Sequence, residues 1–270
     1  MLQAIHNIRA AVKTQQPLIH CITNPISITQ CANAILAVGG RPIMAEHPEE
    51  AAEITRTAKA LMLNLGNITD ARMESIRISA LTAQENNIPI LLDAVGIACS
   101  SLRRAYVRRL LDAVTPTVVK GNYSEIMALY RENYRSSGVD AESSLDIPLL
   151  EEAALSLARR FHCLILASGK VDILTDGHRL FHIRNGTPQL SCITGTGCML
   201  GALCAVYLSA SSGLDAVLTA CAVLGICGEL AEAEQGWGTF SLRLMDGLST
   251  LTDSNLEQRL KLEAIDLEEF

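Results

Sequence analysis

The feature of this 270-residue sequence that most constrains its fold is a repeated alternation between short apolar runs and helical stretches. The runs are bounded by turn residues and read as strands, whereas the stretches between them have helical periodicity. Strands are predicted at 17–23, 41–44, 61–66, 89–96, 117–122 and 163–169, and helices at 28–38, 48–59, 71–85, 101–113, from 124 onward, and at 149–160. Such alternation produces parallel strands joined by right-handed crossovers. We therefore predict an α/β fold with a central, mostly parallel sheet and helices on both faces.

The remaining segments complete this prediction. Residues 131–146 are polar and lack periodicity, so we expect a loop there. Because the alternation resumes after this loop, we expect residues 1–270 to form a single domain. A hairpin is predicted over 171–177 and 178–184, helices over 197–209, 214–234 and 239–252, and a frayed acidic tail at the C-terminus.

Composition excludes several classes of protein. The net charge is −7 and only 4% of residues are aromatic, which argues against a nucleic-acid binder. The basic cluster Arg103, Arg104, Arg108 and Arg109 is more simply a solvated helix face. The chain has nine cysteines with no CxxC pair, and its histidines lack metal-ligand spacing. We therefore expect a reducing, cytoplasmic location and no zinc site.

Targeting and membrane segments are not expected. The N-terminus lacks the long apolar region of a signal peptide. Residues 190–214 carry no charge and are long enough to cross a bilayer, but serines, threonines and glycines interrupt them. We expect a buried core helix in this stretch rather than a membrane span.

Polar residues and glycines follow the predicted strands at one edge. In open α/β sheets, ligands bind beyond the carboxyl ends of the strands. The residues at these ends are Asn24, Leu65 to Asn67, Asp93, Val95, Gly96, Lys120 to Asn122, Glu125, Ser168, Gly169 and Thr194 to Cys198. Each group alone is ordinary loop composition, but together they favour a ligand site.

The sharpest of these groups is Gly195-Thr196-Gly197-Cys198, just before a long helix. Glycines permit a tight turn and a close ligand approach, and the free N–H groups of a helix N-terminus favour an anion. Spacing alone also allows a simple turn before a buried helix. The segment is neither a P-loop nor a GxGxxG motif, so a nucleotide would need a different fold.

Asp93 and Glu125 form a second group, since each lies at or just past a strand end. Two carboxylates near phosphates can hold Mg²⁺, and Lys120 could meet a phosphate. The alternative is that Asn122 or Ser124 caps the next helix, with Glu125 in its first turn. The motif alone does not choose between these interpretations.

The combined pattern resembles the hydroxyethylthiazole kinase family, a branch of the ribokinase-like superfamily. The matching segments span nearly the whole chain, in order: 20–50, 63–69, 91–104, 118–126, 167–177, 194–208 and 236–248. The resemblance implies a ribokinase-like fold and ATP-dependent phosphorylation of the alcohol of 5-(2-hydroxyethyl)-4-methylthiazole in thiamine salvage, with Mg²⁺. It also implies a homotrimer with sites at the subunit interfaces.

The resemblance implies the following residue roles. Met44, Gly195 and Asn24 would line the thiazole site, Lys120 and Ser168 would contact ATP, Gly195, Thr196 and Gly197 would form an anion hole, Asp93 and Glu125 would serve the metal, and Cys198 would stand where related kinases place the catalytic aspartate. A thiol is largely protonated at neutral pH and is a mediocre base, but positioning carries most of the rate of phosphoryl transfer. A cysteine that merely packs at a helix start is the alternative.

The sequence departs from the family pattern at Arg41, Asn67, Ala94, Ala98 and Lys120. Ala98 would narrow the loop after Asp93, and lysine in place of arginine would lose a bidentate phosphate contact. Three alternatives stay open: a kinase of the same fold for another small alcohol, such as a hydroxymethylpyrimidine; a thiol enzyme that uses Cys198 without ATP; and a silent thiazole-binding protein.

Overall fold

The computed structural model describes residues 1–131, 134, 146–234 and 236–267. Its nine strands form one sheet in the order β2-β1-β3-β4-β5-β6-β7-β8-β9. They comprise β1 (Leu18–Ile22), β2 (Arg41–Ile43), β3 (Ala60–Asn64), β4 (Ile90–Asp93), β5 (Val118–Asn122), β6 (Leu164–Ser168), β7 (Asp172–Thr175), β8 (Leu180–Ile183) and β9 (Leu262–Ile265). Pairing is parallel from β2 through β6 and antiparallel from β6 through β9. The predicted α/β fold with a central, mostly parallel sheet is confirmed.

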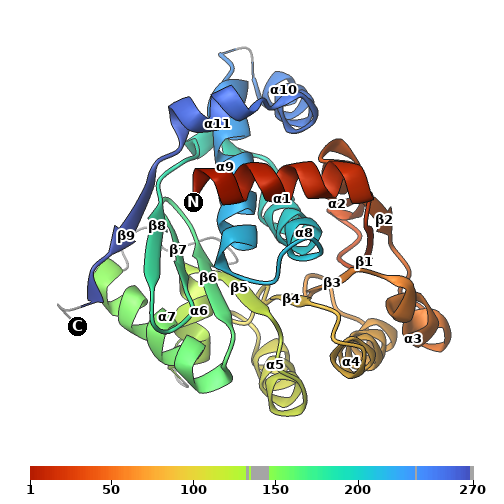
Figure 1. The fold of residues 1–270 in the computed structure, drawn as a ribbon. Helices are drawn as coiled ribbons and strands as arrows, with labels where there is room; N and C mark the ends of the chain where they lie inside the picture. The colour runs from red at the N-terminus through yellow and green to blue at the C-terminus, as the bar shows by residue number, and fades with distance from the viewer. Residues whose placement is uncertain (132–133, 135–145, 235, 268–270) are drawn as a thin grey trace.

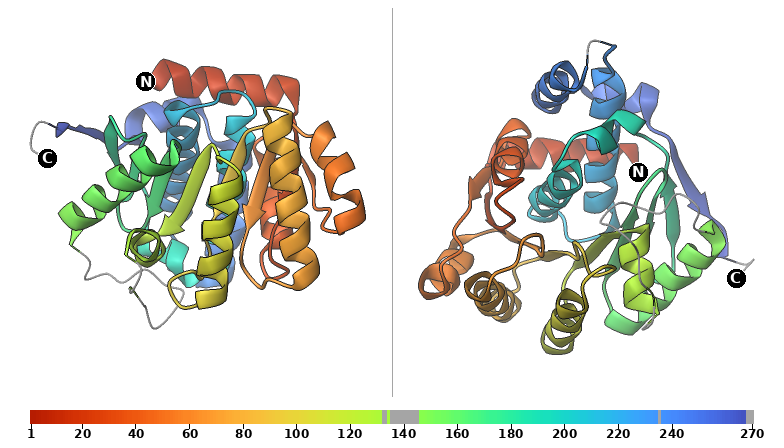
Figure 2. Two further views of the ribbon diagram at one scale, coloured as in Figure 1. Left: turned by 90° about the horizontal axis from the view of Figure 1, so that it is seen from below. Right: turned by 180° about the vertical axis from the view of Figure 1, so that it is seen from behind.

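Helices cover both faces of this sheet. The helices are α1 (Leu2–Gln15), α2 (Ile28–Ala37), α3 (Pro48–Thr57), α4 (Asp70–Glu85), α5 (Ser101–Ala113), α6 (Tyr123–Tyr130), α7 (Ile147–Phe161), α8 (Thr196–Leu208), α9 (Leu214–Ala231), α10 (Trp237–Thr250) and α11 (Asp253–Arg259), with a short 3₁₀ turn η1 (Pro188–Cys192). Figure 1 shows α1, α8 and α9 on one side of the sheet and α4, α5 and α7 on the other. Seen from below in Figure 2, α3, α4 and α5 lie side by side.

Two apolar cores result from this layering. One joins α1, α2, α8 and α9 to the sheet, and the other joins α4 to α7 to its opposite face. Strand β3 is buried along its whole length, as parallel strands covered on both faces are. At Gly201 an added Cβ would lie 2.9 Å from the Cε of Met62. This glycine therefore lets α8 approach β3 closely, just below the carboxyl edge of the sheet.

The uncharged stretch 190–214 is not a membrane-spanning helix. It contains the end of η1 and all of α8, and every residue from Met199 to Leu208 is buried. Of the helices in the described residues, one is long and apolar enough to span a membrane, α9, and 83% of that segment is buried inside the protein. Both α8 and α9 belong to the core.

Two helices and one strand were missed by the sequence interpretation, besides the short turn η1. Helix α1 buries Ile5, Ile8 and Val12, whose spacing is helical, but this segment was considered only as a possible targeting sequence. Helix α11 and edge strand β9 are short and half-exposed, so their apolar periodicity is weak. The predicted loop at 131–146 and the frayed C-terminal tail lie largely outside the described residues.

Candidate functional site

Polar side chains line up across neighbouring strands at the carboxyl edge of the sheet. Asn64 pairs with Asp93, and Asp93 pairs with Lys120, in the register of β3, β4 and β5. Further along, Asn122 pairs with Ser168. Because the strands are parallel, polar residues that end separate apolar runs come together in one row.

Asp93 and Lys120 form a buried ion pair in this row. The Nζ of Lys120 lies 3.1 Å from the Oδ1 of Asp93, and the two side chains are 4% and 1% exposed. Burial acts to lower the pKa of Lys120, but the negative charges of Asp93 and Glu125 outweigh it and raise that pKa, so Lys120 stays charged. Burial raises the pKa of Asp93, against the opposing effects of Lys120 and of a hydrogen bond from Asn64. The pair is thus the electrostatic centre of the edge.

The amide of Asn64 joins this pair to Cys198. Its Nδ2 donates to the Oδ2 of Asp93 over 3.1 Å and to the Sγ of Cys198 over 3.3 Å. Its Oδ1 accepts from the backbone N–H of Gly66 over 2.8 Å, which fixes the orientation of the amide. Asn64 was missed as a site residue. The signal was available: it is the polar end of the apolar run ALMLN, as Asp93 is of ILLD.

Asn24 supplies a second donor to the same sulfur. Its Nδ2 lies 3.3 Å from the Sγ of Cys198 and 3.1 Å from the Oδ1 of Asn64. Its Oδ1 accepts from the backbone N–H groups of Ile26 and Ser27, each over 3.1 Å. Asn24 therefore shapes the turn before α2 instead of capping that helix, whose N-cap residue is Ser27. Cys198, half-buried at the start of α8, faces two amide donors.

The segment Gly195 to Cys198 forms a turn that opens α8, as predicted. Gly195 is the N-cap with a φ of 96°, a conformation that favours glycine. The first N–H groups of a helix have no partner within it and can bind an anion. A Cβ added to Gly197 would lie 4.0 Å from the Nζ of Lys120, so the ammonium approaches this helix start. The hydroxyl of Thr196 donates to the carbonyl of Leu190 over 2.8 Å, which ties the start of α8 to η1.

Glu125 is part of a capping box at the start of α6 and is also held by the loop after β4. One carboxylate oxygen accepts from the N–H of Asn122 over 2.7 Å and the other from Gly96 over 2.6 Å. Burial, followed by the negative charge of Asp93, raises the pKa of Glu125 to about 7. The capping interpretation is therefore correct, and it leaves the metal role of Glu125 as a prediction.

A divalent cation would suit this part of the edge. Two buried carboxyl groups stand beside one ammonium, and burial with the charge of Asp93 raises the pKa of Glu125, so a bound cation would favour its ionised form. Within the described part of the chain, no group of three or more His, Cys, Asp or Glu is placed to hold a metal by itself. Asp93 and Glu125 would therefore need waters or phosphate oxygens to complete the coordination of Mg²⁺.

Met44 and Ser168 lie on different sides of the central row. Met44 follows β2 at the start of residues 44–47, which we call the Met44 loop, and it packs half-buried against the same core as Cys198. Ser168 ends β6, and its hydroxyl donates to the carbonyl of Gly121 over 3.3 Å. Ser168 is followed by residues 169–171, which we call the β6–β7 turn.

Side chains from β1 and α4 hold the Met44 loop. The Nε2 of His20 lies 2.9 Å from the carbonyl of Ala45, which can only accept. The Nη2 of Arg72 lies 2.7 Å from the Oε2 of Glu46, and the hydroxyl of Ser75 donates to the Glu46 carbonyl over 2.6 Å. The loop is therefore fixed through its backbone as well as through a charged side chain.

Two of the departures from the family pattern, Asn67 and Ala98, lie in loops whose backbone carbonyls are held by arginines. Asn67 has a φ of 47°, a conformation that asparagine tolerates, and its carbonyl accepts from Arg72. Ala98 is buried, and its carbonyl accepts from Arg104 over 3.2 Å. The prediction of a solvated arginine face on α5 is wrong for Arg104 and Arg103, since Arg103 also donates to the loop after β4, at Val95.

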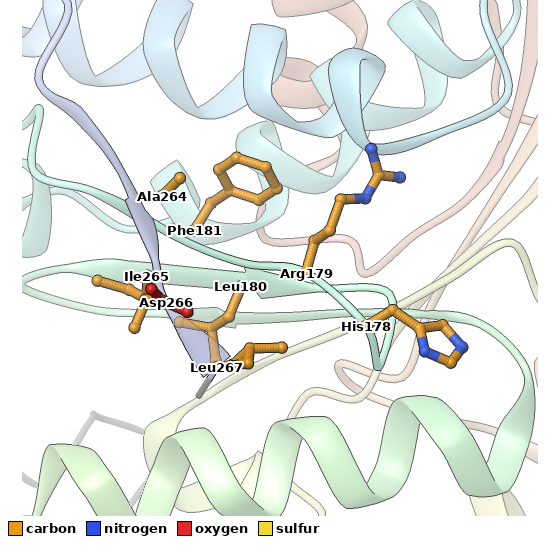
Figure 3. Close-up of a pocket in the computed structure, with 8 residues that line it drawn as sticks. All are labelled: His178, Arg179, Leu180, Phe181, Ala264, Ile265, Asp266 and Leu267. Carbon is orange, nitrogen blue, oxygen red and sulfur yellow. The ribbon is translucent and has the colours of Figure 1, made fainter. Parts of the chain in front are cut away.

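A separate hollow lies at the far end of the sheet. Figure 3 shows its lining, from the β7–β8 connection, β8, β9 and the residues after β9: His178, Arg179, Leu180, Phe181, Ala264, Ile265, Asp266 and Leu267. None of the predicted catalytic, substrate-binding or metal-binding residues lines this hollow. The strand ends and the start of α8 remain the candidate site.

Comparison with known proteins decides the family. The sequence model of the Hydroxyethylthiazole kinase family matches residues 9–254. This chain belongs to the hydroxyethylthiazole kinase family. It is 43% identical over 263 residues to Hydroxyethylthiazole kinase 2 of Clostridium botulinum strain Hall, covering 95% of this chain and 99% of that protein. It is 37% identical over 278 residues to Hydroxyethylthiazole kinase 1 of Methanosphaera stadtmanae, covering 97% of each.

A solved structure supports the assignment of this chain to the hydroxyethylthiazole kinase family. The hydroxyethylthiazole kinase protein of Pyrococcus horikoshii superposes with a TM-score of 0.90 at 31% identity, over 98% of this chain and 100% of that one. A ribokinase-like superfamily protein of Enterococcus faecalis superposes with a TM-score of 0.65 at 10% identity, over 93% of this chain and 88% of that one. The second likeness supports the fold alone.

Proposed function

We propose that this chain transfers the γ-phosphate of ATP to the alcohol of 5-(2-hydroxyethyl)-4-methylthiazole, the activity for which its close relatives are named. The observation that carries the proposal is the thiol of Cys198 at the start of α8, held by Asn24 and Asn64 beside the Asp93–Lys120 pair. A nucleophile-activating group, a cation and a helix N-terminus thus lie together at one edge. Phosphoryl transfer requires that combination.

Cys198 acts as the base in this proposal. The thiazole lies between the Met44 loop and Gly195, with Asn24 nearby, and directs its hydroxyl towards the Sγ of Cys198. In its thiolate form, Cys198 accepts the hydroxyl proton and becomes the neutral thiol as the alcohol oxygen forms a bond with the γ-phosphorus. The bond from that phosphorus to the bridging oxygen breaks, and ADP leaves with the electron pair. Two amide donors fix the sulfur, so that its placement offsets its modest basicity.

The nucleotide lies on the other side of Cys198. Lys120 approaches the transferring phosphate as a positive charge, and Ser168 contacts ATP from the end of β6. The backbone N–H groups of Gly195, Thr196 and Gly197 receive the negative charge that develops on the phosphoryl oxygens. The location of these residues on or beside β5, β6 and α8 supports the proposal, since elements of the sheet and its core hold them.

Mg²⁺ would be held by Asp93 and Glu125, largely through waters and phosphate oxygens. A bound Mg²⁺ neutralises charge on the phosphates. Before any cation binds, the capping box and Gly96 keep the Glu125 carboxylate in place. Lys120 balances part of the carboxylate charge in that state.

We also propose that the protein is a homotrimer and that it is cytoplasmic. Each subunit would consist of a single domain. All nine strands share one sheet, which supports one domain. Helices α2 and α10 pack together and expose Leu36 and Leu242, which are 55% and 71% exposed. Ile26, which is 56% exposed, lies two residues from Asn24, so a subunit contact there would border the site. Light scattering on the purified protein measures the subunit number.

The first test is ADP release from Mg-ATP, with and without the thiazole alcohol, in the wild type and in Cys198→Ala. We expect thiazole-dependent release that falls on the order of a hundredfold in the variant, since a general base contributes at least that much. Cys163→Ala is the matched control: Cys163 is buried just before the opposite end of β6, and we expect unchanged turnover.

Each alternative has its own outcome in this experiment. Folded wild-type protein that binds the thiazole without turnover would be a silent binder. Faster turnover of a hydroxymethylpyrimidine would reassign the alcohol. Turnover without nucleotide, together with a covalent adduct on Cys198, would indicate a thiol enzyme.

A further inference from the structure

The β6–β7 turn is where the sheet changes from parallel to antiparallel pairing. Strand β6 is parallel to β5, whereas β7 is antiparallel to β6. The turn follows Ser168 directly, so its shape determines where the Ser168 hydroxyl and the neighbouring backbone N–H groups lie. Residues 169–171 lie between the two strands, so their backbone N–H and C=O groups need partners outside the strand ladder.

Tyr123 is that partner. Its hydroxyl donates to the carbonyl of Val171 over 2.6 Å and accepts from the N–H of the same residue over 3.0 Å. One phenol thus satisfies both backbone groups of Val171, as the next residue of a strand would. The Tyr123 side chain is buried, 5% exposed.

The ring of Tyr123 also fills the space beside Gly169. A Cβ added to Gly169 would lie 2.4 Å from the Cζ of Tyr123. On its backbone, the N–H of Gly169 donates to the Oδ1 of Asp172 over 3.0 Å. The turn is therefore held at Val171 by the phenol, at Gly169 by the ring and at Gly169 again by a carboxylate.

The same helix start fixes Tyr123 and Glu125. Tyr123 is the first residue of α6, directly after Asn122, and Asn122 closes the capping box with Glu125. Asn122 is also the strand partner of Ser168. The first turn of α6 thus links the carboxylate on the phosphate side to the turn on the nucleotide side.

We propose that Tyr123 is a positioning residue for the nucleotide, which holds the β6–β7 turn so that Ser168 and its neighbours meet ATP and which leaves the thiazole side unaffected. The inference rests on the proposed function, in which Ser168 contacts ATP. Tyr123 does not itself touch the reacting atoms, so its loss should affect the binding of ATP and leave the binding of the thiazole unchanged.

Tyr123→Phe tests this, because it keeps the ring and removes both hydrogen bonds to Val171. We expect the KM for ATP and the Kd for ADP, measured by calorimetry, to rise roughly three- to tenfold, which corresponds to the loss of a buried hydrogen bond. The KM for the thiazole and kcat at saturating ATP stay at the wild-type values. The control is Tyr106→Phe, which removes a buried hydroxyl bonded to the carbonyl of Met73 over 2.5 Å, away from the site. We expect it to change neither KM.

A double mutant separates contact from general damage. Gly169→Ala should raise the KM for ATP because its methyl group meets the Tyr123 ring, and the same change in a Tyr123→Ala background should add nothing further. An unchanged KM for ATP and Kd for ADP in Tyr123→Phe, with an active wild type, would overturn the inference, as would equal rises in both KM values. A wild type that binds ADP but shows no thiazole-dependent turnover would instead refute the proposed function.

Discussion

The two proposed substrate sides of the site are built differently: the Met44 loop, on the proposed thiazole side, is held by an ion pair and a histidine, whereas the β6–β7 turn, on the proposed nucleotide side, is held by a phenol and a carboxylate that accepts one backbone N–H. Arg72 is 7% exposed and its partner Glu46 is 48% exposed, so one member of the pair is buried and the other meets solvent. Tyr123 is uncharged at neutral pH and closes its turn with two hydrogen bonds to one residue.

The difference follows from how the two segments connect their strands. The Met44 loop joins β2 to α3 and receives its contacts from β1 and α4, which lie far from it in the sequence. The β6–β7 turn joins two adjacent antiparallel strands, so most of its register comes from the strands themselves. A loop of the first kind depends on side chains for its position, and charged side chains lose more when a partner is removed. We therefore expect the thiazole side to be the more sensitive to substitution and to pH.

Lys120 lies between the two sides, and its replacement gives the largest expected effect. Lys120→Met leaves Asp93 buried without its counter-charge, which typically costs about 3–5 kcal/mol of the free energy of unfolding. We also expect turnover to fall by on the order of a hundredfold or more, with weaker binding of both substrates. Urea unfolding and steady-state kinetics measure these changes, with the exposed Lys59→Met as the control. If Lys120→Met changed only the KM for ATP, Lys120 would act in nucleotide binding alone and not on both substrates.

Arg72→Met tests the thiazole side alone. It removes the pair with Glu46 and the bond to the carbonyl of Asn67, so the Met44 loop loses its charged support. We expect the KM for the thiazole to rise about tenfold and the free energy of unfolding to fall by about 2 kcal/mol, as for hydrogen bonds to a charged group. The KM for ATP should not change.

Arg77→Met provides the matched control for Arg72. Arg77 lies on the same helix but pairs with Glu74 on the exposed surface, where such pairs contribute little. We expect the free energy of unfolding to stay within about 0.5 kcal/mol of the wild type. If Arg72→Met raised both KM values together, the two sides would not be independent, and the contrast drawn above would fail.

The parts of the site that the sequence predicts are those fixed by neighbours along the chain. Asp93, Lys120 and the Gly195–Cys198 turn follow from apolar runs that end in polar residues and from a glycine turn before a helix. The fold followed in the same way, because each parallel strand and its crossover helix form a local unit. Helix α1 and strand β9 were not predicted. The segment of α1 was considered only as a targeting sequence, and the apolar periodicity of β9 is weak.

Contacts between distant segments could not be predicted. Asn24 and Cys198 are 174 positions apart, and the role of the asparagine depends on an amide whose orientation is fixed by its own turn. Tyr123 likewise meets Val171 across 48 positions. Nothing in the motif Asn122-x-x-Glu125 shows that the residue inside it would reach the next turn of the sheet edge. Such contacts need the three-dimensional register of β5, β6 and β7.

The pH dependence of stability provides the finest test of the comparison, through His20. Burial lowers the pKa of His20 from its ordinary 6.5, against a hydrogen bond to Ala45 and the charge of Glu50. Below pH 6.5 the unfolded chain therefore binds a proton that the folded chain resists, so this histidine costs stability as the pH falls through 6.5 towards its lowered value. A charged ring would still donate to Ala45, but its burial is unfavourable, so we expect acidification to destabilise the packing of His20 that holds the Met44 loop.

His20→Gln isolates this contribution, because glutamine can keep a donor near the carbonyl of Ala45 but does not titrate. Burial raises the pKa of Glu125 to about 7, so Glu125 gives the opposite slope, with stability lost as the pH rises. That slope is common to both proteins and cancels in their difference. We therefore expect the wild type to lose stability relative to His20→Gln between pH 7.5 and pH 5.5 in urea unfolding, and its KM for the thiazole to rise over the same range more than its KM for ATP. Parallel pH curves for the two proteins would show that His20 does not hold the Met44 loop through a buried neutral ring, and the thiazole side would then depend on Arg72 and Ser75 alone.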